Sequence, residues 1–167
     1  MIEMPTPSAR TSAISAIAMF VPVTFAIILL PRTWWTEYLG ILFHLALFLL
    51  VPRLSAPDWA KAAGYGWLLL DVTVGIMALN QVPQEVTMPI RLGGHVFAGL
   101  WIVSASFAGS AAMKLVGVIA GVWLFSFSFV SPFLPYKALA PATLMVLLWL
   151  AIIALQNGSK RTGPHPV

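Results

Sequence analysis

One aspartate stands in the middle of a long apolar segment. Asp71 lies within GYGWLLLDVTVGIMALN, residues 64–80, whose other members are mostly apolar or small. An ionisable side chain at membrane depth is costly, so it normally faces the interior of a helical bundle or a water-filled cavity. Gly64 and Gly75 share a helical face with Asp71, and small residues let neighbouring helices approach closely. We therefore expect Asp71 to point inward and to mark a functional site.

Two histidines are expected near the depth of Asp71. At about 1.5 Å per helical residue, His44 falls close to the membrane midplane, whereas His95 falls about 6 Å nearer the outer surface. A carboxylate beside an imidazole in a medium of low dielectric constant can share or pass a proton, and proton-coupled transporters use this arrangement. The structural alternative is a hydrogen bond that satisfies Asp71, donated by one imidazole or by Thr73.

Arg91 stands close to Gly93 and Gly94 near the expected start of a helix. The positive end of a helix, together with glycines that let the backbone approach a ligand, favours the binding of an anion. Alternatively, the arginine extends toward lipid headgroups, as long basic side chains commonly do.

Four tryptophans are expected near the middle of the membrane, although tryptophan prefers the membrane interface. Trp67 lies one helical turn from Asp71, and Trp101, Trp123 and Trp149 fall at a similar depth. We expect Trp67, Trp101 and Trp123 to shape an aromatic pocket for a cationic or planar ligand. Asp71 would then be the counter-charge. The alternative is that these bulky side chains only pack the core.

The composition of the chain places it in a lipid bilayer. Of its 167 residues, 60% are hydrophobic and only 8% are charged, a balance unsuited to a water-exposed surface. Since the chain has no cysteine, disulfides, thiolate metal sites and cysteine nucleophiles are excluded. Its nine basic residues are spread thinly along the sequence, so nucleic acid is not an expected partner.

Six segments are long and apolar enough to cross a bilayer as helices, at about 20 residues per crossing. Their continuous apolar runs favour helices over barrel strands, which alternate between polar and apolar residues. We predict an all-α, polytopic integral membrane protein, a six-helix bundle in one domain over residues 1–157 with a polar tail over 158–167. The helices are expected at 12–31, 36–53, 60–81, 90–108, 112–131 and 138–157.

Short connections make sequential helices antiparallel neighbours. Pro31, Pro83 and Pro135 recur at intervals of 52 residues, each at the end of an expected helix. This spacing is compatible with three tandem helical hairpins, since some transporters contain internal repeats. The alternative is that bilayer thickness alone spaces the helices evenly.

The fifth helix carries a motif for close helix packing. Gly117 and Gly121 form a G-x-x-x-G pattern, which favours a close crossing with another helix rather than chemistry. We expect its partner to be the fourth helix, at Gly94 and Ala98.

Basic residues are unequally divided between the two expected membrane surfaces. The positive-inside rule makes the richer surface cytoplasmic, which places both termini inside the cell, and we expect a bacterial cytoplasmic (inner) membrane. The richer surface carries Arg10, Arg53, Lys61, Lys114, Lys160 and Arg161, and the other carries Arg32, Arg91 and Lys137.

The leading functional hypothesis is a small membrane transport or ligand-binding subunit. Its site would lie around Asp71, His44 and His95, between the second, third and fourth helices, and would be proton-coupled. We do not expect an enzyme. In size and helix count the chain is similar to the six-helix substrate-binding subunits of vitamin transporters. The expected partners are the lipid bilayer, a small-molecule ligand and either further copies of the chain or a larger membrane complex.

Three alternatives remain open on the sequence alone. One is a b-type haem electron-transfer protein with His44 and His95 as axial ligands. Another is an intramembrane metal-dependent enzyme acting on a lipid or isoprenoid, with His44, His95 and Asp71 as metal ligands. The last is a non-catalytic assembly subunit. The sequence leaves the cofactor, the coupling ion and the substrate unknown.

Overall fold

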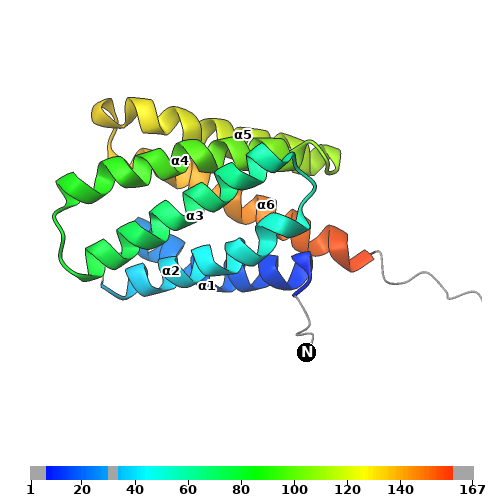
Figure 1. The fold of residues 1–167 in the computed structure, drawn as a ribbon, viewed down its shortest axis with the longest axis horizontal. Coiled ribbons are helices and arrows are strands. Elements are labelled where there is room, and N and C mark those ends of the chain that lie inside the picture. The colour runs from blue at the N-terminus through cyan, green and yellow to red at the C-terminus, as the bar shows by residue number, and fades with distance from the viewer. Residues whose placement is uncertain (1–6, 30–33, 160–167) are drawn as a thin grey trace, which may run out of the picture.

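The computed structural model describes residues 7–29 and 34–159, and these residues form six α-helices with no strand among them (Figure 1). Short 3-10 segments follow α2 at Val51–Arg53, follow α5 at Ser131–Phe133, and precede α6 at Tyr136–Leu139. The predicted all-α class is therefore confirmed. The helices are α1 Ala9–Leu29, α2 Trp35–Leu50, α3 Asp58–Leu79, α4 Gln84–Ser106, α5 Ala111–Val130 and α6 Ala140–Ser159.

Within the described ranges, five helices, α1 to α5, are long and apolar enough to cross a membrane, and α6 adds a shorter apolar helix over Ala140–Gln156. Crossing the hydrocarbon core takes about 20 residues. The chain is thus a helical membrane bundle, as predicted. Residues 160–167 of the expected tail lie outside the described residues, and so do Pro31 and Arg32.

The fourth helix begins earlier than the sequence suggested. We expected it to start at residue 90, after Pro89, but α4 starts at Gln84 and contains Pro89. Pro83 precedes the helix in an extended conformation, with φ −55° and ψ 145°. Pro89 lies near the start of α4, where loss of one backbone hydrogen bond is tolerated more readily than in the helix interior. Arg91 therefore lies about two turns inside α4 rather than at its start.

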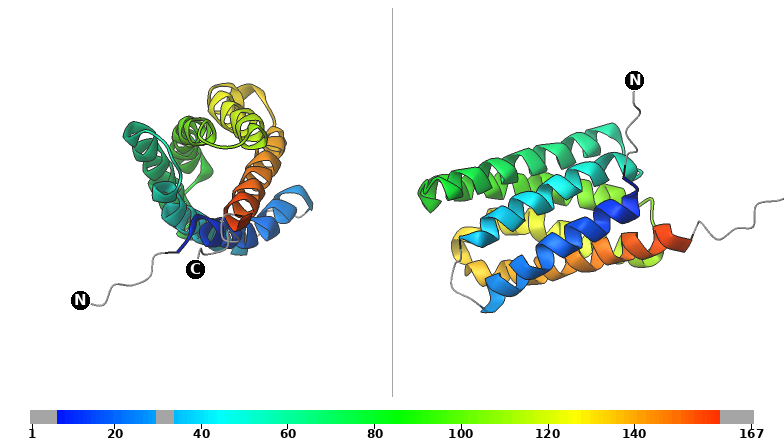
Figure 2. Two further views of the ribbon diagram at one scale, coloured as in Figure 1. Left: turned by 90° about the vertical axis from the view of Figure 1, so that its right-hand side faces the viewer. Right: turned by 90° about the horizontal axis from the view of Figure 1, so that it is seen from below.

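The six helices form a ring. Each helix packs against its neighbours in the sequence, and α6 packs against α1 to complete the circle (Figure 2, left). The predicted pairing of sequential helices is confirmed. Because α2 packs on α3 and α4 on α5, as well as within each hairpin, the three-hairpin repeat stays a prediction.

A close helix crossing joins α4 and α5. A Cβ atom added to Gly99 would lie 2.5 Å from the carbonyl oxygen of Gly121, so only hydrogen fits there. Gly117 faces the last turn of α4 in the same way. The predicted close crossing is confirmed, but its partner positions, Gly94 and Ala98, were wrong. The short connection over 107–110 sets the antiparallel register, which matches the start of α5 to the end of α4.

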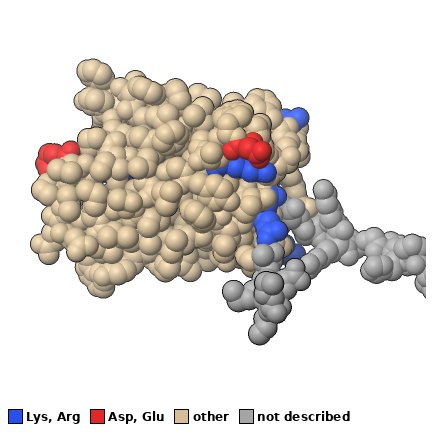
Figure 3. Space-filling view, in the orientation of Figure 1, with Lys and Arg blue, Asp and Glu red and all other residues tan. Residues whose placement is uncertain are grey.

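The two ends of the ring differ in charge. Basic side chains gather at the end where α1, α3 and α5 begin, and the face shown in Figure 3 carries few charges between the ends. Glu37 and Glu85 lie in the first turns of α2 and α4, at the opposite end. The described basic residues at the first end are Arg10, Arg53, Lys61 and Lys114. Of the other predicted surface cations, Lys160 and Arg161 lie outside the described residues, as does the side chain of Lys137.

Candidate functional site

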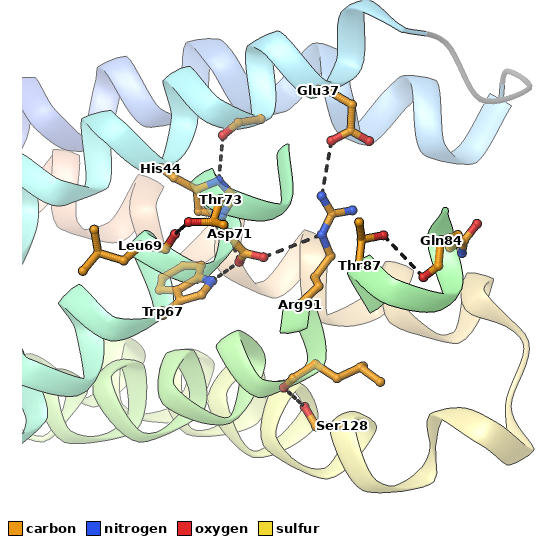
Figure 4. Close-up of polar contacts among 12 residues, drawn as sticks. Glu37, His44, Trp67, Leu69, Asp71, Thr73, Gln84, Thr87, Arg91 and Ser128 are labelled. Atoms are coloured by element: carbon orange, nitrogen blue, oxygen red, sulfur yellow. Dashed lines mark hydrogen bonds and ion pairs between the residues drawn. The ribbon is translucent and has the colours of Figure 1, made fainter. Parts of the chain in front are cut away.

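Asp71 points into the bundle from the middle of α3 and is only 4% exposed. Trp67, one turn earlier on the same helix, donates its indole N–H to Asp71 Oδ2. His44 Nε2 on α2 lies 3.2 Å from that same oxygen. From α4, Arg91 Nε lies 3.6 Å from Asp71 Oδ1 (Figure 4). Three neighbouring helices therefore place polar groups around one buried carboxyl.

His44 has both ring nitrogens engaged. Its Nδ1 lies 2.7 Å from the carbonyl oxygen of Gly40, and its Nε2 faces Asp71. A carbonyl oxygen and a carboxylate can only accept hydrogen bonds, and a neutral imidazole has a single N–H to donate. The His44–Asp71 pair can therefore hold an additional proton between Nε2 and Oδ2.

Arg91 lies between two carboxyl groups. Its NH2 group donates to Glu37 Oε2 at 3.2 Å, and its Nε faces Asp71. The guanidinium therefore turns inward, so the alternative that Arg91 extends to lipid headgroups is wrong. The predicted anion site at a helix start is also not formed, because Arg91 lies inside α4. Gly94 instead faces α3, where an added Cβ would meet Trp67 at 3.4 Å.

A cavity of about 400 Å³ lies inside the ring and is lined by residues from all six helices. Its charged and titratable wall consists of Glu37, His44, Asp71, Arg91 and His95, from α2, α3 and α4. The remaining wall is mostly apolar or aromatic and includes Phe20, Val23, Ala26, Phe43, Trp67, Val74, Met88, Leu124, Leu139 and Val146. Gln84, which is exposed at the start of α4, also lines the cavity. The cavity thus reaches the surface at the end of the ring opposite Arg10 and Lys61.

His95 lines the same cavity but stands apart from the carboxyl group. It is buried, one turn beyond Arg91 on α4, and its Nδ1 has no hydrogen-bond partner within the described part of the chain. Of the predicted trio, the structure therefore joins His44 to Asp71, while His95 faces the shared cavity without contacting either through a hydrogen bond or ion pair among the described residues.

Three tryptophans lie in sequence from the cavity toward the basic end of the ring. Trp67 lines the cavity, and ring-centroid distances of 5.9 Å and 5.5 Å connect it through Trp101 to Trp149. Trp101 and Trp149 are fully buried, and Trp149 donates to Ser106 Oγ at 2.8 Å. Gly64 leaves room for this group, since an added Cβ would lie 2.9 Å from Trp101. Trp101 therefore supports the cavity from behind rather than lining it.

Trp123 does not join this group. Its side chain is 43% exposed, and its indole N–H donates to the carbonyl oxygen of Ala138 at 3.0 Å. The predicted role of Trp123 in the pocket is not supported, because the position of a residue along a helix gives its depth and not the direction in which it points. Thr73, the alternative partner of Asp71, instead donates to its own helix at Leu69.

Glu37 is a site residue that the sequence analysis missed. It lies in the first turn of α2. One sequence signal points to it, because Glu37 precedes His44 by seven residues, or two helical turns, on one face. Gly40 lies on that face as well and also lines the cavity.

The donor groups do not favour a metal or haem. Among the residues that the structure describes, no three His, Cys, Asp or Glu side chains come close enough to hold a metal ion. Both nitrogens of His44 already have partners, so axial ligation of haem would require breaking one of these contacts.

Comparison of the chain with models of known protein families, with curated proteins and with solved structures gives no match. The likeness to the substrate-binding subunits of vitamin transporters is therefore one of size and helix count only.

Proposed function

We propose that this protein binds a small molecule in its central cavity and transports it across the membrane, with the proton of the His44–Asp71 pair as the coupling ion. The observation that carries this proposal is a cavity of about 400 Å³ with the His44–Asp71 pair on its wall. Pockets for small molecules typically measure about 300–1,000 Å³ and combine apolar walls with a few polar groups.

The location of the pair supports a role in coupling. Ionisable groups inside membrane proteins commonly form substrate or ion pathways and proton relays. A purely structural ion pair needs no adjoining space, yet both Asp71 and His44 line the cavity. Protonation of this pair changes the charge of the cavity wall, so the binding of a ligand and the binding of a proton affect each other. Proton-coupled transport requires such a link.

The distribution of basic residues supports an orientation. Arg10, Arg53, Lys61 and Lys114 lie at the end of the ring away from the cavity mouth. The positive-inside rule places this end in the cytoplasm. In a bacterial cytoplasmic membrane, the cavity would then open outward and the N-terminal end of α1 would face the cytoplasm.

The lack of cysteine in the chain permits a direct test of the cavity. Thr143 lines the cavity, whereas Leu144, the next residue on α6, is 48% exposed on the outside of the ring. In cells or sealed vesicles, a membrane-impermeant thiol reagent added to the outer side should label Thr143→Cys. Leu144→Cys should resist, because a thiol surrounded by acyl chains does not form the reactive thiolate. Failure to label a folded Thr143→Cys from either side would overturn the proposal.

Coupling is tested in proteoliposomes that contain a pH-sensitive dye. A proton gradient should drive uptake of transported solutes from a mixed small-molecule pool, an inward gradient for symport or an outward gradient for exchange, and the same solutes should move protons when the gradient is absent. Asp71→Asn should abolish both effects. Asp58→Asn, the same change on an exposed residue at the start of α3, should abolish neither.

A further inference from the structure

On the basis of the proposed function of the cavity, we propose that His95 is the residue that binds the polar group of the ligand. The ligand would be a small uncharged molecule with an apolar body and one hydrogen-bonding group, such as a hydroxyl or an amide. His95 would then select such molecules over purely apolar ones of the same size.

The imidazole of His95 has unused hydrogen-bonding capacity. His95 lines the cavity and is buried, with 9% of its surface exposed. Its Nδ1 has no hydrogen-bond partner in the described part of the chain, whereas buried polar side-chain atoms nearly always have one. Water can bind the imidazole when the cavity is empty. A ligand that displaces such water loses affinity unless it reproduces the hydrogen bond, so this position favours a ligand with a polar group.

The other polar side chains on the described wall already have partners. Ion pairs and hydrogen bonds join Glu37, His44, Asp71 and Arg91. Thr87 and Thr143 donate to backbone carbonyl oxygens of nearby residues, and Thr36 and Gln84 are engaged as well. Among the described polar residues of the wall, His95 is therefore the one that a ligand can bind without competing with an existing hydrogen bond or ion pair.

The wall of the cavity is divided into a polar half and an apolar half. Its described ionisable residues all come from α2, α3 and α4. The described lining residues of α1, α5 and α6 are apolar except Thr143. Because α2, α3 and α4 are consecutive in the ring, and α5, α6 and α1 complete it, the two halves face each other (Figure 2, left). A ligand that fills both halves therefore combines a polar group with an apolar body.

The apolar half provides a surface for the body of the ligand. Phe20 of α1 and Phe43 of α2 stack with ring centroids 4.0 Å apart where the two halves meet. Leu124 and Val146 continue the apolar wall on α5 and α6. Removal of apolar ligand surface from water favours binding in proportion to the area buried. The cavity volume of about 400 Å³ limits this body to that of a small molecule.

The ionised groups of the described wall contact one another, which favours an uncharged ligand. Arg91 lies between Glu37 and Asp71, and His44 contacts Asp71. His95 lies roughly 16 Å of helix rise from Gln84 at the cavity mouth, so the counter-charge for a charged group bound there would have to come from these residues. A buried charge is costly unless it is paired, and separating an existing buried pair is unfavourable. An uncharged polar group can bind His95 without this cost.

Four probes that share one aromatic ring can test this class of ligand: benzyl alcohol, ethylbenzene, benzylamine and benzoate. The first two have nearly the same shape and differ in the hydroxyl group, and the last two carry a positive and a negative charge at neutral pH. Each probe is titrated against the rate at which N-ethylmaleimide labels Thr143→Cys in the purified protein at one pH. The concentration that halves the rate measures occupancy of the cavity.

The role of His95 is measured by adding His95→Leu to the Thr143→Cys protein. For each probe, the half-protecting concentration with the leucine is divided by that without it, which cancels partitioning of the probe into detergent. The ratio should be roughly two- to tenfold for benzyl alcohol, as expected for the loss of one hydrogen bond, and near one for ethylbenzene. His95→Gln, which keeps a hydrogen-bonding group, should restore most of the affinity for benzyl alcohol.

A control variant and the charged probes make the result specific. Thr24→Val removes a buried hydroxyl on α1 that donates to the carbonyl oxygen of Phe20 and is not part of the cavity lining, so it should give ratios near one for all four probes. Equal ratios for benzyl alcohol and ethylbenzene in His95→Leu would show that His95 only shapes the cavity. A larger ratio for benzylamine or benzoate than for benzyl alcohol would rule out the uncharged class.

A chemical test that needs no substitution of His95 remains informative if His95→Leu fails to fold. Diethylpyrocarbonate acylates accessible, unprotonated imidazoles, and mass spectrometry of peptides measures each histidine separately. His95 should react faster than His44, whose two ring nitrogens both have partners, and benzyl alcohol should slow the reaction of His95. An unreactive His95 in a protein whose Thr143→Cys form is labelled would reject its role in binding.

The outcomes separate this inference from the proposed function. If N-ethylmaleimide does not label a folded Thr143→Cys protein, the open cavity is absent and both proposals fail. If the thiol is labelled and every probe protects it equally well with and without His95, the cavity stands and only the assignment of the ligand to His95 is rejected.

Discussion

The indole N–H of Trp67 is donated to the carboxyl group of Asp71, and the two residues lie one turn apart on the same helix. One of the contacts that orient the carboxyl therefore comes from α3 itself. His44 and Arg91 contact the same carboxyl from α2 and from α4. Each contact can be removed separately, which leads to the predictions below.

Replacing Trp67 by phenylalanine should destabilise the protein while keeping an aromatic ring against the cavity. The change removes the N–H donated to Asp71, and a hydrogen bond to a charged group contributes about 1.5–3 kcal/mol. The free energy of unfolding, measured by denaturant titration in detergent, should fall by that order. Trp123→Phe is the matched control, since Trp123 is partly exposed and donates to a backbone carbonyl. Equal losses in the two variants would contradict a special role for the Trp67–Asp71 contact.

Two substitutions of Asp71 should have different effects. Asparagine keeps an oxygen that accepts from Trp67 and should fold, but it should lose proton coupling. Leucine leaves His44 and Arg91 without the carboxyl, and breaking a buried ion pair by removing one partner costs about 3–5 kcal/mol. We expect Asp71→Leu to lower the yield of monodisperse protein in size-exclusion chromatography. A stable and active leucine variant would show that the charge has no role.

The contact between Arg91 and Glu37 should be energetically coupled. In a double-mutant cycle of Arg91→Gln and Glu37→Gln, the losses in unfolding free energy should be non-additive by about 0.5–3 kcal/mol, as found for residues in one ionic network. Glu85, exposed at the same end of the ring, supplies the control cycle with Arg91. If the Glu85 cycle gave the same coupling energy, the effect would be long-range rather than due to the 3.2 Å contact.

The crossing of α4 and α5 should distinguish two glycines on one helix. Gly99→Ala would place a methyl group 2.5 Å from the Gly121 carbonyl oxygen, whereas Gly93→Ala would meet nothing within 4 Å. Overpacking of this kind costs about 1–3 kcal/mol. At Gly93, the better helix propensity of alanine should be neutral or stabilising by up to about 1 kcal/mol. Thermal unfolding of both variants checks this, and similar melting temperatures would refute the close crossing.

The depth of each residue along its membrane helix could be predicted from the sequence, because a helix rises by a constant distance per residue. Counting residues placed His44 and Asp71 at one level, and the structure brings them to 3.2 Å. The inward direction of Asp71 followed from the cost of exposing a charge to lipid. The helical class followed from the continuous apolar runs in the same way.

For helices other than α3, rotation about the helix axis could not be predicted, because it depends on the neighbours that a helix meets. Trp123 has a suitable depth but points away from the cavity, whereas Glu37 begins a helix near the surface and still reaches Arg91. Closure of the ring by α6 on α1 is a contact between distant parts of the chain, which local patterns do not encode. The start of α4 was missed because Pro89 resembles a helix boundary and is instead accommodated in the helix.

Trp67, Trp101 and Trp149 lie one behind another between the cavity and the basic end of the ring, and Trp101 and Trp149 are fully buried. In the proposed transport, the helices that carry these three rings would have to separate before a bound solute could pass to the other side of the membrane. Movement would then proceed one molecule per conformational cycle rather than as a continuous flux.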